Sequence, residues 1–61
     1  MKLWNFQAER YDEVAQVTDT NALLYMPTNK VIENRYVTLR QQGEQPIQAM
    51  TAILGSHSVW N

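Results

Sequence analysis

The sequence has no cysteine, a single histidine, two glycines and two prolines among its 61 residues. Without cysteine no disulfide can stabilise the fold, and one histidine alone cannot build the usual zinc ligand sets. Two glycines are too few for a loop that cradles phosphate, and no loop spaces its carboxylates as a calcium site requires. The chain is therefore expected to hold no metal and no cofactor.

Basic residues are scarce as well. Five Lys and Arg against six Asp and Glu give a net charge of −1, and the pI is about 5.6. A basic excess supplies most of the non-specific attraction to nucleic acid and anionic lipid, so its absence favours a protein partner. No apolar run has the length of a signal peptide or of a membrane span, which needs roughly 18 residues. Because the chain also lacks cysteine, we expect a cytoplasmic protein that does not enter a membrane.

The length of the chain limits its core. Residues 1–61 are enough for one small domain, and a chain of this size buries only about 60% of its unfolded surface on folding. Five of its hydrophobic residues are alanines and three are methionines. A second protein surface would add apolar burial, so we expect the chain to self-associate or to dock on a larger protein.

The first third of the chain has a helical pattern. Apolar residues recur at helical spacing, at Trp4, Ala8, Tyr11 and Ala15. This pattern predicts an amphipathic helix over residues 4–17, with the acidic side chains on its other side. A second helical segment of one or two turns is expected over residues 21–26, and it ends before Pro27, which has no backbone N–H.

Two further helices are expected in the second half. Residues 28–42 have a stripe at Ile32, Tyr36 and Leu39, and neither face of a strand over these residues would be cleanly apolar. The last helix begins at Pro46 and ends at Gly55. The predicted fold is an all-α bundle of three to four short helices. The alternative is an α+β fold with a β-hairpin from Ala22 to Leu39, turning at "PTNK", before the last helix.

Gly43 and Pro46 lie between the last two helices, as in the turn of a helix-turn-helix. A recognition helix needs hydrogen-bond donors near its start and cations beside it. The donors here are Gln45 and Gln48, and the nearby cations are Arg35 and Arg40, with no Lys or Arg from residue 41 onward. A dimeric helix-turn-helix transcriptional regulator is therefore the alternative function, with nucleic acid as a less favoured partner.

Catalytic residues are not expected. Ser56, His57 and Ser58 are adjacent in a terminal segment, and adjacent residues do not form a nucleophile and base pair with an orienting group. Carboxylates act as an acid and base pair only where a cleft separates their pKa values, and so short a chain has little material for a cleft. The chain is therefore not expected to be an enzyme.

Aromatic and acidic residues are the candidates for binding a partner. Trp60 is one residue from the end, so it either folds back on the core or anchors a partner, as tryptophan often does at interfaces. The partner-binding residues that we predict are Trp4, Phe6, Glu9, Asp12, Glu13 and Trp60. The expected function is a small non-catalytic protein-interaction module. Size and composition also suit accessory subunits, inhibitors, and antitoxin-like or phage-encoded regulators, an analogy that no residue motif supports.

Overall fold

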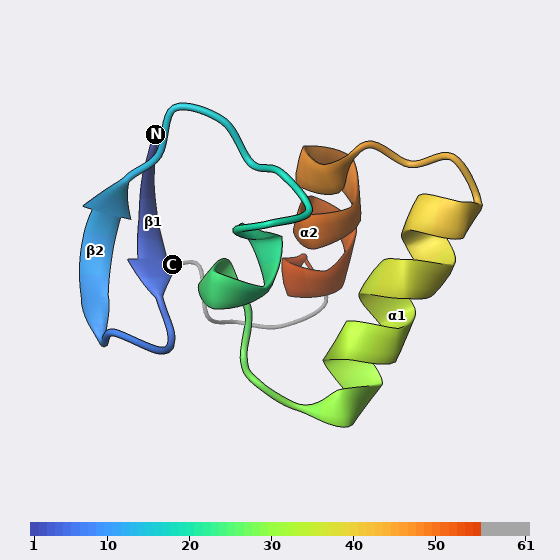
Figure 1. Ribbon diagram of the computed structural model, residues 1–61, viewed down its shortest axis with the longest axis horizontal. Coiled ribbons are helices and arrows are strands. Elements are labelled where there is room, and N and C mark those ends of the chain that lie inside the picture. The colour runs from blue at the N-terminus through green and yellow to red at the C-terminus, as the bar shows by residue number, and fades with distance from the viewer. Residues whose placement is uncertain (56–61) are drawn as a thin grey trace.

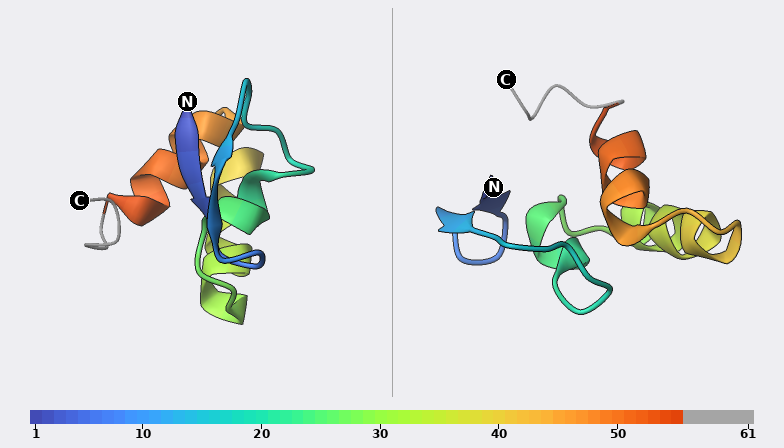
Figure 2. Two further views of the ribbon diagram at one scale, coloured as in Figure 1. Left: turned by 90° about the vertical axis from the view of Figure 1, so that its left-hand side faces the viewer. Right: turned by 90° about the horizontal axis from the view of Figure 1, so that it is seen from above.

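The computed structural model describes residues 1–55. It contains strand β1 (Lys2–Asn5), strand β2 (Arg10–Glu13), the 3₁₀ helix η1 (Ala22–Tyr25), helix α1 (Lys30–Gln41) and helix α2 (Pro46–Leu54). The two strands form an antiparallel hairpin at one end of the molecule, and α1 lies at the other end, with η1 and α2 between them (Figures 1 and 2). The fold is thus α+β, and the predicted all-α bundle is wrong.

The correction concerns the N-terminal segment. The helix predicted over residues 4–17 is replaced by the hairpin, in which Leu3 pairs with Asp12 and Trp4 pairs with Tyr11. Three members of the predicted helical stripe, Ala8, Tyr11 and Ala15, are exposed. The alternative hairpin over residues 22–39 is also wrong, because that segment forms η1 and most of α1.

A single side chain shapes the turn of the hairpin. The Oδ1 atom of Asn5 accepts hydrogen bonds from the backbone N–H groups of Gln7 and Ala8, at 2.9 and 2.8 Å. This local bonding offers the backbone a turn in place of a helix. Glu9 then closes the turn with a φ of 55°, in the left-handed region, where non-glycine residues are uncommon. The chain therefore reverses at residues 6–9 and cannot continue as a helix.

The helix predictions for the second half are confirmed. Asn29 caps α1, since its Oδ1 accepts a hydrogen bond of 2.9 Å from the N–H of Ile32. Gly43 has a φ of 95° just after α1, where a left-handed residue ends a helix favourably. Pro46 is the first residue of α2, a position where its missing N–H costs nothing. Local signals thus set both ends of α1 and the start of α2.

The core joins the hairpin to the helices. Leu3, Val14 and Val17 contribute from the N-terminal part, and Met26, Met50 and Ile53 are almost fully buried between η1 and α2. The N–H of Phe6 donates to the carbonyl oxygen of Leu24 at 2.7 Å, which ties the turn of the hairpin to η1. Among residues 1–55, no helix combines the length and the apolar character that a membrane crossing needs.

Candidate functional site

The hairpin brings five of the six predicted partner-binding residues together. Trp4, Phe6, Glu9, Asp12 and Glu13 all lie on β1, β2 or the turn between them. Trp60, the sixth, lies outside the described residues. The sequence predicts Trp4 and the acidic residues on opposite sides of one helix, whereas the hairpin distributes the five residues over two faces and a turn.

The outer face of the hairpin has an aromatic pair. Because side chains alternate along a strand, Lys2 and Trp4 share one face with their partners Glu13 and Tyr11. The rings of Trp4 and Tyr11 meet edge to face, with centroids 5.0 Å apart and planes at 69°. Tyr11 is 64% exposed. The helical pattern instead predicts Tyr11 in a core stripe. The one signal for this pair in the sequence is the position of the two aromatic residues on either side of the hairpin turn.

The inner face of the hairpin carries a polar cluster. Asn5, only 5% exposed, donates from Nδ2 to Oδ2 of Asp12 at 3.0 Å. The Nε atom of Arg10 donates to Oδ1 of Asp12 at 2.8 Å, and the Tyr25 hydroxyl is 3.4 Å from Oδ2. The bond from Arg10, followed by that from Asn5, holds the pKa of Asp12 below its usual value. Asp12 therefore bonds to its own chain, whereas Glu9 and Glu13 are exposed.

The outer edge of β2 has unpaired backbone groups. Met1 and Val14 exchange two hydrogen bonds, Met1 N to Val14 O at 2.8 Å and Val14 N to Met1 O at 2.7 Å. Hydrogen-bonded and non-hydrogen-bonded residue pairs alternate along an antiparallel ladder. Because Met1 and Val14 form a hydrogen-bonded pair, Tyr11 and Glu13 belong to non-hydrogen-bonded pairs, and their N–H and C=O groups point away from β1. In Figure 1, β1 lies on one side of β2, and no other helix or strand of residues 1–55 borders its other side.

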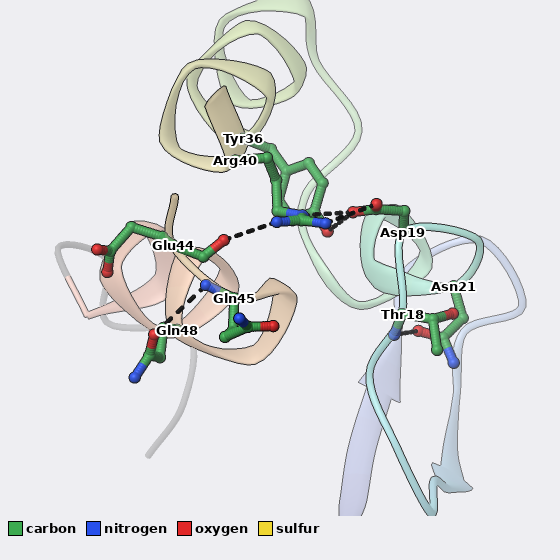
Figure 3. A network of polar contacts seen from close by, with 8 residues as sticks. All are labelled: Thr18, Asp19, Asn21, Tyr36, Arg40, Glu44, Gln45 and Gln48. Carbon is green, nitrogen blue, oxygen red and sulfur yellow. Dashed lines mark hydrogen bonds and ion pairs between the residues drawn. The ribbon is translucent and has the colours of Figure 1, made fainter. Parts of the chain in front are cut away.

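A second polar cluster joins the segment before η1 to α1 (Figure 3). Asp19 accepts hydrogen bonds from the Tyr36 hydroxyl at 2.5 Å and from Nε and Nη2 of Arg40 at 2.8 and 3.0 Å. These donors, Arg40 first, lower the pKa of Asp19 to about 2. Burial, with the bond to Asp19, raises the pKa of Tyr36 to about 12. Nη1 of Arg40 also donates to the carbonyl oxygen of Glu44 at 2.8 Å.

This cluster bears on the residues of the DNA-binding alternative. The charge of Arg40 is balanced by Asp19, and its guanidinium is held by two parts of its own chain. Arg35 is exposed on α1. Gln45 and Gln48 are exposed at the start of α2, where Oε1 of Gln48 accepts from the Gln45 N–H at 3.3 Å (Figure 3). Of the two predicted phosphate-binding arginines, Arg40 has a carboxylate partner and Arg35 has none among residues 1–55.

Two open hollows flank the ion pair between Asp19 and Arg40. One, of about 510 Å³, lies toward Met1, Pro46 and Ile47. The other, of about 420 Å³, lies toward Leu23 and Val37. Within residues 1–55, no three His, Cys, Asp or Glu side chains come together as a metal site would require. Ser56 to Ser58 lie outside the described residues. The two hollows are open, and the charged groups that line both of them are Asp19 and Arg40, which neutralise each other.

Comparison of the chain with protein-family models, with curated proteins and with solved structures yields no match.

Proposed function

We propose that the chain is a small non-catalytic protein-interaction module whose recognition element is the hairpin β1–β2. The observation that carries the proposal is the Trp4–Tyr11 pair, which lies on the outer face beside the open edge of β2. Tryptophan and tyrosine are enriched among the residues that dominate binding energy at interfaces. An unpaired strand edge offers main-chain hydrogen bonds to a partner.

The two polar clusters are assigned a structural role in this proposal. In each of them a carboxylate, Asp12 or Asp19, is bound by donors of its own chain. General acid and base catalysis would need a group free to exchange a proton with a substrate near neutral pH. The pKa of Asp19 at about 2 and that of Tyr36 at about 12 are far from that range. We place the module in a reducing compartment such as the cytoplasm, since small extracellular domains of this size are rich in disulfides.

The test compares three tagged forms of the protein as baits. Tyr11→Ser removes one ring of the aromatic pair, and Val31→Ser is the matched control, because Val31 is 75% exposed on α1 at the far end of the molecule. Each bait is incubated with native lysate in two parallel samples, one treated with nuclease and one untreated. Melting curves establish beforehand that all three baits are folded at the assay temperature.

The expected result is a protein that wild type and Val31→Ser retain and Tyr11→Ser loses. That protein is then purified, and its dissociation constant for Tyr11→Ser should be at least about tenfold higher than for wild type, as loss of an interface anchor predicts. Equal retention by all three baits would refute the hairpin as the recognition element. Loss of every partner on nuclease treatment, with DNA recovered without it, would favour the helix-turn-helix alternative.

A further inference from the structure

The open edge of β2 restricts how another strand can pair with it. In an antiparallel ladder, directly opposite residues have side chains on the same face and the same hydrogen-bonding sense. Tyr11 and Glu13 have outward backbone groups, and Arg10 and Asp12 do not. A strand that joins this edge must therefore bond to Tyr11 and Glu13 and place its alternate side chains opposite Arg10 and Asp12.

A second copy of β2 can meet this edge in three registers. With Tyr11 opposite Tyr11, Arg10 of each copy lies opposite Asp12 of the other, so two pairs of opposite charge form within the strands. Glu13 has Glu9 of the other copy as its counterpart, but Glu9 lies outside β2, in the turn, with a φ of 55°. With Tyr11 opposite Glu13, the two Asp12 residues lie opposite each other, and with Glu13 opposite Glu13, two carboxylates again meet. Opposite charges across strands stabilise a sheet and like charges destabilise it, so the charges select the first register.

From this charge complementarity we propose that two copies of the chain pair through the outer edges of β2, antiparallel, with Tyr11 opposite Tyr11. The inference rests on the proposed function, because it takes the hairpin as the recognition element, and it adds a second copy of the chain as a partner at the edge of β2. Pairing converts two hairpins into one four-stranded sheet. A two-stranded hairpin is marginally stable in water, and additional strands with an apolar face stabilise it.

The outer face of the paired sheet would be aromatic. Four rings form a row across its strands, because Tyr11 pairs with Trp4 within each copy and with Tyr11 of the other copy at the junction. Aromatic pairs across strands add to the stability of a sheet. The inner face of the new junction carries the two Arg10–Asp12 contacts. The Nε atom of Arg10 already bonds to Asp12 of its own copy at 2.8 Å, so the contact across the junction is made by the terminal Nη atoms of this side chain, which is 68% exposed.

The paired segment is short, so the association is weak. β2 has four residues, and the area that it can bury is well below that of a standard protein interface. We expect a dissociation constant of about 0.1 to 1 mM, in the range of transient contacts. With this dissociation constant the protein is monomeric in dilute solution and dimerises only at high concentration.

Cross-linking through a single introduced cysteine tests the register. The sequence has no cysteine of its own, so each variant carries one thiol. In the proposed register the two Cα atoms at position 11 are about 5.5 Å apart, within the range of a disulfide. The two Cα atoms at position 13 are four residues out of register, or about 13 Å apart, which is beyond that range.

Tyr11→Cys should therefore form a covalent dimer on mild oxidation at least about tenfold faster than Glu13→Cys, given these separations. Val31→Cys on α1 measures the rate of random collision, since Val31 is 75% exposed, against 64% for Tyr11. Equal rates for the three variants, or faster cross-linking of Glu13→Cys, would overturn the proposed pairing.

A backbone substitution tests the edge itself. The N–H of Tyr11 points outward, so Tyr11→Pro removes a donor from the open edge and leaves the ladder between β1 and β2 intact. Lys2→Pro is the matched control, because the N–H of Lys2 points outward from the other edge of the hairpin. Circular dichroism establishes that both variants keep the fold.

In sedimentation equilibrium, wild type and Lys2→Pro should self-associate alike, and Tyr11→Pro should associate at least about tenfold more weakly, since it blocks the paired edge. A wild-type chain that stays monomeric up to several millimolar would overturn the dimer. That result leaves the proposed function standing, because the bait experiment scores a purified second protein and does not depend on self-association. If Tyr11→Pro unfolds, the cysteine rates decide.

Discussion

Replacement of Asn5 by alanine tests whether one buried polar side chain maintains the hairpin. Asn5 is only 5% exposed, and it makes three hydrogen bonds. Its Oδ1 accepts from the N–H groups of Gln7 and Ala8, and its Nδ2 donates to Asp12. Alanine removes all three bonds, and it leaves a partly buried carboxylate without one of its donors.

The size of the effect follows from these contacts. A neutral hydrogen bond contributes about 1 kcal/mol, and a bond to a charged group contributes more. Because the N–H groups of Gln7 and Ala8 lie in an exposed turn, water replaces part of what they lose. We therefore expect Asn5→Ala to lower the free energy of unfolding by about 2 to 3 kcal/mol. For a chain of this length the melting temperature should fall by roughly 15 °C.

Thermal and urea unfolding, followed by circular dichroism and tryptophan fluorescence, measure this loss. Asn34→Ala is the control, because Asn34 is exposed on α1, where alanine is a better helix former. The control should be neutral or slightly stabilising. If Asn5→Ala changes stability by no more than the control does, the hairpin does not depend on the side chain of Asn5, and our reasoning is refuted.

Four further predictions concern the Asp19 cluster and the helical half. Folding lowers the pKa of Asp19 from 3.8 to about 2, so the contribution of Asp19 to stability is complete above about pH 4 and is lost as the pH falls from there toward 2. In Asp19→Asn, the free energy of unfolding should therefore decrease less over this pH range than in wild type. The pKa of Tyr36 is raised from 10.0 to about 12, so its contribution is complete below pH 10 and is lost as the pH rises toward 12, and Tyr36→Phe should remove that alkaline loss. Met50, which is fully buried, should cost about 2 to 4 kcal/mol when replaced by alanine in urea unfolding. Gly43→Ala should cost about 1 kcal/mol in the same assay, since its φ of 95° strains any side chain.

Local chemistry explains why the helical half was predictable. Asn29 caps α1 with a bond to a residue three positions away, and Gly43 and Pro46 act through their own backbone conformations. The alternating faces of residues 31–39 also excluded a strand correctly. In this half the buried positions follow the helical period, with Ile32 and Tyr36 on α1 and Met50 and Ile53 on α2.

The hairpin was not predictable because its stabilising contacts are polar and non-local. Three of the four residues in β2 are charged, which is rare in strands. Its inward position Asp12 is acceptable only because Asn5 and Tyr25, seven and thirteen residues away, donate to it. Read without those partners, the sequence of β2 does not alternate between apolar and polar residues as a half-buried strand does. The spacing of Trp4, Ala8, Tyr11 and Ala15 then favoured a helix that the structure does not form.

The candidate site was therefore predicted as a set of residues and not as a geometry. Trp4, Glu9 and Glu13 lie on a hairpin where a helix was predicted, and Asp12 is bound internally. Tyr11, which was not among the predicted residues, pairs with Trp4 on the outer face. The DNA-binding set differs for a similar reason. Asp19 lies 21 residues before Arg40, and nothing in the sequence near either residue indicates that they pair.

The charges that obscure β2 as a strand also determine what its edge can bind. Arg10 and Asp12 have opposite sign and lie two residues apart on one face, so the pattern is complementary to its own reverse. Two like charges at these positions would repel a second copy in both antiparallel registers that place Tyr11 opposite Tyr11 or Glu13, and two apolar residues would accept many strands without discrimination. The present pair does neither: it favours one register with a second copy and penalises those that bring carboxylates together. Because Asn5 and Tyr25 already hold Asp12 in place, the edge is ordered before a partner arrives, and less conformational entropy is lost on association.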